Sequence, residues 1–248
     1  SLSATPHTMP SSTTENARSA RVPGTRAALI WGSIAAVLVT VATIGVFLVA
    51  PEDADQGVIQ RIFYFHVAIA LVSLVAFGVA CVAGILFLRT RNPRWDDLGE
   101  ASIRIGLLFS VLVVITGSIW AKASWGTWWV WSDPRLVTYM IVVLIYAAYF
   151  VLRSSAEDDR RMRYSAIYAI AGFASVPLSF YSVRVANSFV HPVVFTRGGA
   201  NMPNSMLVWF LISLAAMLAL FIALLQVELL GRRAERSLRR LALMLEAS

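Results

Sequence analysis

Apolar residues occur along the chain in six long blocks, and short polar segments separate them. The blocks cover residues 27–50, 62–88, 105–119, 136–152, 164–183 and 205–227. We interpret each block as a helix that crosses a hydrocarbon core of ~30 Å. None shows the strict alternation of apolar and polar residues that a barrel strand needs. The pattern therefore predicts an all-α integral membrane protein with six transmembrane helices.

Polar segments at both ends divide the chain into three parts. Residues 1–25 are rich in Ser, Thr, Ala and Arg without an apolar pattern, which predicts a disordered N-terminal tail. Residues 26–230 hold the six blocks and form the transmembrane domain. Residues 231–248 alternate Arg pairs with Leu and Ala. This last pattern predicts a basic amphipathic helix that lies against an anionic membrane surface.

Charge decides the orientation of the six helices. Hydrophobic residues make up 58% of the chain and charged residues 14%, yet the formal net charge is +7. Of the 21 Lys and Arg residues, 16 lie in residues 1–26, 89–104, 153–163 and 231–248. These segments alternate with the other three connections, so the positive-inside rule places both termini in the cytoplasm. Because the positive charge serves topology, we expect no nucleic-acid partner.

The unusual residues all fall on the predicted outer side. With this topology the outer connections are residues 51–60, 120–135 and 184–204. His66 and His191 lie on or next to them, and the stretch WGTWWVW between them holds four of the eight tryptophans. The sequence thus predicts a tryptophan-rich segment on the outer face, between the third and fourth helices, with a histidine on either side along the chain.

Each histidine has two interpretations. His66 lies about five residues into the second helix, either as a hydrogen-bonded packing residue or as a metal ligand. An ionisable group at membrane depth favours a functional role, and a neutral imidazole binds transition metals and haem iron. His191 is followed by Pro192 and by the pair Gly198 and Gly199, which favours irregular backbone. It is either an exposed loop histidine or a second ligand.

The tryptophans also have two interpretations. Tryptophan is enriched at membrane interfaces, so the cluster can belong to an aromatic belt. If the segment is helical, Trp125, Trp128 and Trp129 share one face and Trp131 turns away from it. Such a face is a flat apolar platform that suits a large planar ligand.

Charged residues next to the tryptophans add a polar edge to this platform. Lys122 and Arg135 can pair with carboxylates of a ligand. Alternatively, Asp133 and Arg135 only cap the fourth helix. A planar apolar ring that carries carboxylates and a metal able to accept two imidazoles is haem. Two axial histidines would have to bring their ligating nitrogens within roughly 4 Å of one another, taking ~2 Å metal bonds as the guide.

WGTWWVW followed by Asp133 and Arg135 resembles the WWD motif of the CcmC family, the haem-handling proteins of cytochrome c biogenesis. RIFYFHV around His66 and TGSIWAK before the motif agree with this resemblance, which covers nearly all of residues 26–230. Two positions depart from the family pattern: Ser132 stands between the last Trp and Asp133, and Ala68 stands where proline is usual.

The resemblance implies a site in which His66 and His191 are the axial ligands of haem b, held transiently as cargo. It implies the platform Trp120, Trp125, Trp128, Trp129 and Trp131. It also implies that Asp133, Arg135 and Lys122 face the haem propionates or complete the motif.

The resemblance further implies a haem-binding protein of the bacterial cytoplasmic membrane that is not an enzyme. It would present haem at the outer face to the haem chaperone CcmE, and a lyase-like assistance to that chaperone stays open. The implied partners besides the lipid bilayer are the ABC-type subunits CcmA and CcmB and the small membrane protein CcmD.

Three alternatives remain beside this hypothesis. A cytochrome c synthetase subunit is usually longer and carries more histidines. A solute permease or channel subunit lacks the midplane charges and paired broken helices that mark such a site. An outer copper site would use His66, His191 and Met202, without ligand spacing to recommend it. Cys81 is the single cysteine, so the chain has no C-x-x-C-H motif for attaching haem to itself.

Overall fold

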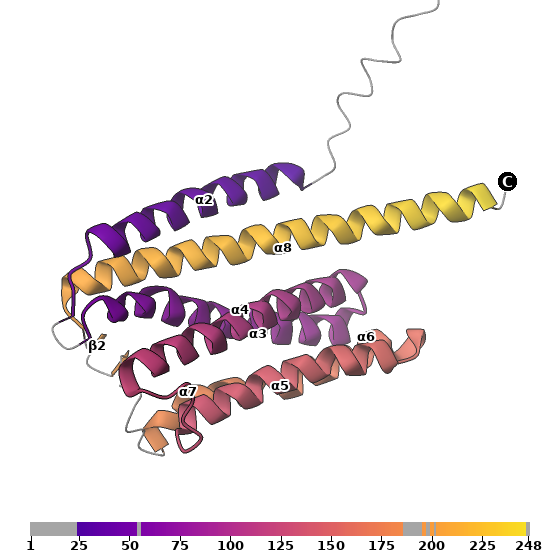
Figure 1. Cartoon of the computed structure of the whole chain (residues 1–248). Helices are drawn as coiled ribbons and strands as arrows, with labels where there is room; N and C mark the ends of the chain where they lie inside the picture. Colours follow the sequence, from indigo (N-terminus) through magenta and orange to yellow (C-terminus); the bar gives the residue numbers. More distant parts are fainter. Residues whose placement is uncertain (1–23, 54–55, 186–194, 197–198, 201, 247–248) are drawn as a thin grey trace, which may run out of the picture.

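The computed structural model describes residues 24–53, 56–185, 195–196, 199–200 and 202–246. Helices make up almost all of this part of the chain (Figure 1). The helices and strands in chain order are α2 (Thr25–Leu48), η1 (Val58–Gln60), α3 (Arg61–Thr90), α4 (Pro93–Trp125), α5 (Pro134–Ser155), α6 (Asp158–Phe173), α7 (Ser175–Val185), β1 (Phe195–Thr196), β2 (Gly199–Ala200) and α8 (Asn204–Glu246). The strands β1 and β2 pair antiparallel in a hairpin of two residues each.

Six helical segments of the described residues are long and apolar enough to cross a membrane. This confirms the six predicted transmembrane helices and the all-α class. Several helices run past the apolar blocks, because a block marks only the part that crosses hydrocarbon. α4 begins 12 residues before its block at Ile105, where Asn92 accepts a hydrogen bond from the backbone N–H of Arg94 and Pro93 occupies the first turn.

The fifth predicted helix, residues 164–183, is not continuous. It is interrupted at Ala174, between α6 and α7. Pro177 explains the break, since proline has no N–H to donate to the carbonyl of Phe173 and its ring crowds that carbonyl. The two pieces together still form one candidate span, Arg160–Ser182.

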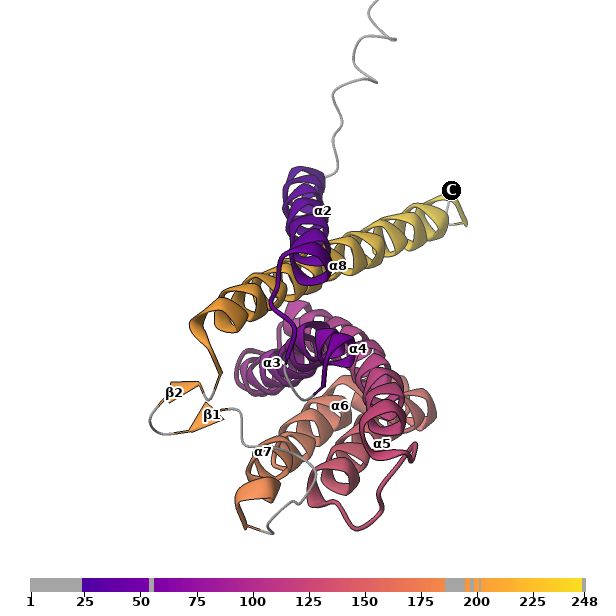
Figure 2. The ribbon, with the colours of Figure 1, turned by 60° about the vertical axis from the view of Figure 1, so that its left-hand side comes forward.

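The helices are arranged in three tiers, which Figures 1 and 2 show from two directions. α3 and α4 pack along one another in the middle, α2 and α8 pair on one side, and α5, α6 and α7 lie on the other. Small residues let the two helices of a tier approach closely. Gly45 faces Trp209, and a Cβ at Gly45 would come within 1.8 Å of a ring carbon. At Gly106 a Cβ would come within 2.9 Å of the ring of Phe77, as expected for helices that pack in a membrane.

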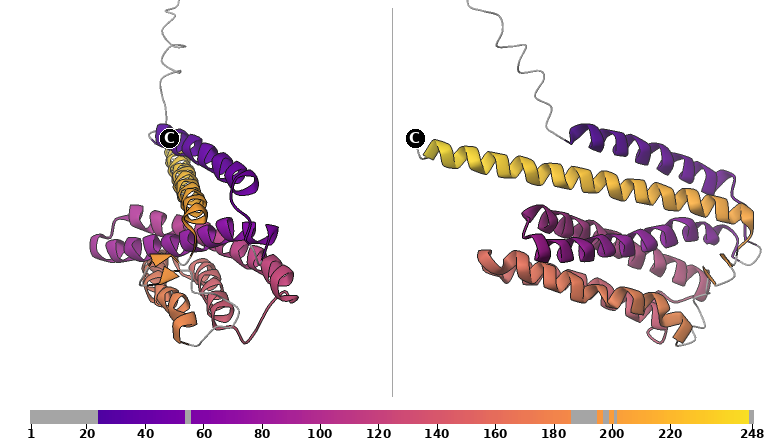
Figure 3. Two further views of the ribbon diagram at one scale, coloured as in Figure 1. Left: turned by 90° about the vertical axis from the view of Figure 1, so that its left-hand side faces the viewer. Right: turned by 180° about the vertical axis from the view of Figure 1, so that it is seen from behind.

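The two ends of the bundle differ in what they carry. At one end, the loop end, lie the connections α2–α3 and α4–α5 and the β1–β2 hairpin (Figures 1 and 3). At the other end, the terminal end, α2 begins and α8 ends. Which end faces the cytoplasm stays a prediction from the charge pattern.

α8 continues as one helix past the other helices at the terminal end (Figure 3). Residues 231–246 are thus helical, but they are not a separate helix that begins at residue 231. Arg, Ala, Leu and Glu, which are strong helix formers, make up most of this extension, and the exceptions are Gly231, Ser237 and Met244. That residues 231–248 lie against the membrane surface stays a prediction, and the described part of the tail continues the direction of α8 (Figure 3).

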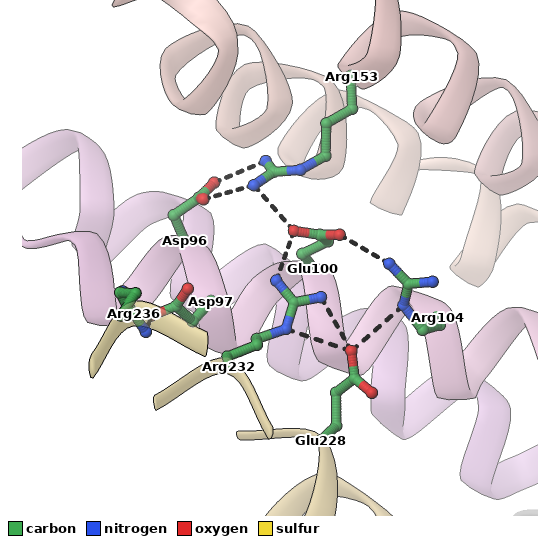
Figure 4. A network of polar contacts seen from close by, with 8 residues as sticks. All are labelled: Asp96, Asp97, Glu100, Arg104, Arg153, Glu228, Arg232 and Arg236. Atoms are coloured by element: carbon green, nitrogen blue, oxygen red, sulfur yellow. Dashed lines mark hydrogen bonds and ion pairs between the residues drawn. The ribbon is translucent and has the colours of Figure 1, made fainter. Parts of the chain in front are cut away.

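A network of charged side chains joins α4, α5 and α8 at the terminal end (Figure 4). Its members are Asp96, Asp97, Glu100, Arg104, Arg153, Glu228, Arg232 and Arg236. Glu100 is its centre, with contacts of 2.9 Å to Arg153, 2.6 Å to Arg232 and 2.9 Å to Arg104. Arg153 also makes a two-pronged contact with Asp96, at 2.9 and 2.7 Å. The acids and arginines balance in number, so the network is neutral and ties the base of the α8 extension to the bundle.

Candidate functional site

His66 lies at the loop end, on the face of α3 that packs against α4. Its Nδ1 is 2.8 Å from the hydroxyl oxygen of Thr116 on α4. Next to Thr116, a Cβ at Gly117 would come within 2.8 Å of the His66 Cε1, so only glycine leaves room for the ring there. His66 is half-buried. The structure therefore holds this imidazole against α4 near the end of the bundle.

Trp120 stands beside His66, one turn after Thr116 on α4. The two rings meet edge to face with centroids 5.8 Å apart, and Trp120 packs in the same way against Phe63 at 6.4 Å. Its indole N–H donates to the side-chain oxygen of Gln56 in the α2–α3 connection, at 3.1 Å. The structure thus places Trp120, one of the predicted platform residues, in contact with His66 and against the cluster that includes Phe210.

The tryptophan-rich segment itself is a loop, so the helical condition under which Trp125, Trp128 and Trp129 would share one face is not met. α4 ends at Trp125, because Gly126 takes the left-handed conformation with φ 74° and closes the helix. Residues 126–133 then run without regular structure to α5. Trp128 and Trp131 are 59% and 76% exposed, whereas Trp129 is half-buried and meets Trp131 edge to face at 5.9 Å.

Asp133 has the capping role that the sequence left as an alternative. Its carboxylate accepts a hydrogen bond from the backbone N–H of Leu136 at 3.0 Å, Pro134 follows in the first turn, and Asp133 is buried. Ser132 lies with Trp131 in the turn before this cap. Because the segment is a loop, the extra residue lengthens the turn and does not rotate a helix.

The two cations of the predicted polar edge contact the protein backbone. Lys122 donates from its Nζ to the carbonyl of Gly126 at 2.8 Å and so closes the end of α4. Arg135 donates to the carbonyl of Phe180 at 3.3 Å, with its guanidinium 5.9 Å from the centre of the Phe180 ring. Arg135 therefore ties the start of α5 to α7 and does not cap α5.

The second predicted ligand, His191, lies outside the described residues. The β1–β2 hairpin that follows it is at the loop end (Figure 2). Met202, the third residue of the copper alternative, packs against the aromatic cluster that includes Trp120. Within the described part of the chain, no group of three His, Cys, Asp or Glu side chains is arranged to hold a metal ion.

Sequence reasoning missed Thr116, Gly117 and Gln56. The stretch TGSIWAK contains two of them, but it served only as a family resemblance. A Thr-Gly pair one turn before a tryptophan is a usable signal, since small and hydroxyl residues mark close helix contacts in membranes.

The fold and the site together define a multi-pass helical membrane protein with a histidine and an aromatic loop at one end. The family model described as "CcmC: Heme exporter protein C" matches residues 12–243. The chain belongs to the Heme exporter protein C family.

Curated relatives agree with this assignment. Heme exporter protein C of Bradyrhizobium diazoefficiens is 32% identical over 208 residues, which cover 81% of this chain and 79% of the relative. Heme exporter protein C of Escherichia coli strain K12 is 36% identical over 161 residues, 64% of this chain and 65% of the relative. A putative cytochrome c biosynthesis ccmC-like mitochondrial protein of Marchantia polymorpha is 32% identical over 160 residues, 64% of this chain and 68% of the relative. The resemblance seen in the tryptophan motif is confirmed, and it implies a role in haem handling.

Proposed function

We propose that this chain binds haem b as cargo at the outer face of a bacterial cytoplasmic membrane and transfers it to the haem chaperone CcmE during cytochrome c maturation. The observation that carries the proposal is the position of His66. A half-buried imidazole is held in one orientation by Thr116 and Trp120 at the end of the bundle that also carries the tryptophan loop. A histidine that served only to pack α3 against α4 would not need exposed tryptophans at the same end of the bundle.

Haem would be bound through its iron and through its ring. His66 supplies one axial imidazole and His191 the other, which requires the two ligating nitrogens to approach within roughly 4 Å. The position of the β1–β2 hairpin at the loop end supports this, because the hairpin begins four residues after His191. The chain has only one further histidine, His7, in its N-terminal segment.

The tryptophan loop would supply the surface for the ring. Trp128 and Trp131 expose broad apolar faces, which suit a flat porphyrin, and Trp120 and Trp125 precede them on α4. The indole N–H of Trp129 is buried and has no hydrogen-bond partner among the residues that the structure describes. A buried donor of this kind fits an anionic oxygen such as that of a haem propionate.

The polar residues of the motif would have different roles. Lys122 is exposed and uses one of its three ammonium donors on Gly126, so it can also meet a propionate. Asp133 and Arg135 shape the loop, Asp133 by starting α5 and Arg135 by anchoring it to α7. Cargo transfer needs no bond-making by these side chains, so we assign a transport role and no enzymatic one.

The charge at the two ends of the bundle supports an orientation in the membrane and a place for each partner. The basic terminal end would face the cytoplasm, by the positive-inside rule. There it is available to the ABC-type subunits CcmA and CcmB and to CcmD, whereas the loop end would face CcmE.

The absorption spectrum of the purified protein tests this function. We expect haem to co-purify with a low-spin spectrum typical of two imidazole ligands, and His66→Ala and His191→Ala each to abolish that spectrum. His7→Ala is the matched control and should leave it unchanged. A wild type without haem when haem is plentiful, or ligand variants with the wild-type spectrum, would defeat the proposal. Copper in a metal analysis would favour the site formed by His66, His191 and Met202 instead.

A further inference from the structure

Three residues within residues 116–120 of α4 surround the imidazole of His66. The hydroxyl oxygen of Thr116 lies 2.8 Å from Nδ1. Gly117 faces the ring edge, where a Cβ would come within 2.8 Å of Cε1. Trp120 meets the ring edge to face, with centroids 5.8 Å apart. Together they leave the ring little freedom to turn about its own axis.

The hydroxyl of Thr116 also has partners within its own helix. Its oxygen is 2.8 Å from the carbonyl oxygen of Leu112, four residues earlier, and 3.3 Å from that of Val113. A hydroxyl has one proton and two lone pairs, and in a helix that proton usually goes to the carbonyl four residues back. The oxygen of Thr116 then accepts the contact with His66, so the proton of that hydrogen bond comes from Nδ1. A neutral imidazole that is protonated at Nδ1 has its lone pair on Nε2.

We propose that Thr116 and Gly117 are positioning residues that hold His66 as the Nδ1–H tautomer, so that it binds haem iron through Nε2. The inference rests on the proposed ligation by His66 and adds how that ligand is prepared. Thr116 selects the nitrogen and Gly117 provides the space for the ring. A hydrogen bond from Nδ1–H also makes the imidazole a stronger donor to iron. This favours ferric over ferrous haem.

The first experiment uses the protein without haem and measures the tautomer directly. In ¹⁵N-histidine-labelled protein, the two ring nitrogens of His66 are assigned by their loss in His66→Ala. We expect one tautomer with a protonated Nδ1 in wild type and in Thr116→Ser, which keeps the hydroxyl. Thr116→Val has the same shape but cannot accept a hydrogen bond, so it should show a mixture. A wild type protonated at Nε2, or a Thr116→Val spectrum identical to wild type, overturns the inference.

The second experiment measures haem binding. Loss of a residue that orients a metal-binding histidine typically weakens binding 10- to 100-fold, and we expect this for Thr116→Val. Thr116→Ser should stay close to wild type. The reduction potential of bound haem should rise in Thr116→Val, since the imidazole becomes a weaker donor and the ferric state loses more. Thr40→Val is the matched control, because Thr40 makes the same back-bond, 2.8 Å to the carbonyl of Ala36, on exposed α2.

Gly117→Ala is a second variant that does not depend on the hydroxyl. Its methyl group must displace the imidazole, so haem binding should fall while Gly32→Ala, where nothing lies within 4 Å of the added Cβ, has no effect. Normal haem binding and potential in both Thr116→Val and Gly117→Ala would overturn the positioning role while leaving ligation by His66 intact. An unchanged haem spectrum in His66→Ala would overturn the ligation itself and the positioning role with it.

Discussion

Replacing Glu100 by glutamine should loosen the terminal end of the bundle, because Glu100 is the carboxylate that three arginines share. Its side chain is 11% exposed, and those of Arg153 and Arg232 are 14% and 16% exposed. Glutamine keeps the size and one acceptor of the carboxylate but removes its charge. The network then carries one uncompensated positive charge in a half-buried position.

The size of the effect follows from these contacts. A hydrogen bond that involves a charged group contributes about 1.5–3 kcal/mol. Glutamine leaves arginine as the only charged partner, so each contact falls from the upper to the lower end of this range. Each of the two buried contacts thus loses about 1–1.5 kcal/mol, while Arg153 keeps Asp96 and Arg232 keeps Glu228. The third contact adds at most about 0.5 kcal/mol, because Arg104 is 53% exposed and the pair is on one helix. We therefore expect a loss of about 2–3 kcal/mol, or roughly 30- to 150-fold in the unfolding equilibrium.

The assay is reversible unfolding of the purified protein in mixed micelles, followed by tryptophan fluorescence. Arg104→Gln is the matched control and should change the free energy of unfolding by less than about 1 kcal/mol. In the double variant Glu100→Gln/Arg232→Gln the two losses should not add, with a coupling of about 1 kcal/mol or more. Amide exchange should also quicken in residues 228–246 but not in α2. A Glu100→Gln protein within about 0.5 kcal/mol of wild type, or additive losses in the double variant, would refute this account of the network.

Three further variants test the packing of α2, the start of α5 and the tryptophan loop. Gly45→Ala should destabilise by about 3 kcal/mol, the upper end for overpacking, because its methyl group collides with Trp209, and thermal unfolding should show Gly32→Ala as neutral or slightly stabilising. Asp133→Ala should lose about 0.5–2 kcal/mol with the helix cap, and a melting temperature equal to wild type would count against that role. Trp131→Ala should leave stability within about 0.5 kcal/mol, since the side chain is 76% exposed, yet weaken haem binding in a titration; equal haem affinity would remove Trp131 from the platform.

The sequence by itself determined the number of membrane-spanning helices and the family. Crossing hydrocarbon requires long apolar helices with all backbone groups bonded internally, so each crossing is a local property that a window of about 20 residues reveals. The break before Pro177 has an equally local cause, the missing N–H, but the apolar block alone predicted one continuous helix. The tryptophan motif was specific enough to indicate the family without any coordinates.

The spacing of the tryptophans did not show which conformation that motif adopts. Trp125, Trp128 and Trp129 have helical spacing, but Gly126 between them takes a positive φ that ends α4. Glycine is permitted in a helix as well as at its end, so the sequence pattern fits both outcomes.

The partners of individual side chains were decided only by tertiary structure. Thr116 lies 50 residues from His66, Asp96 lies 57 from Arg153, and Glu100 lies 132 from Arg232. Apolar periodicity indicates which residues avoid water, but it does not specify which helices become neighbours or how far they are rotated. Those choices arise when small residues on α4 allow α3 to approach. This close packing fixes the orientation of the His66 imidazole.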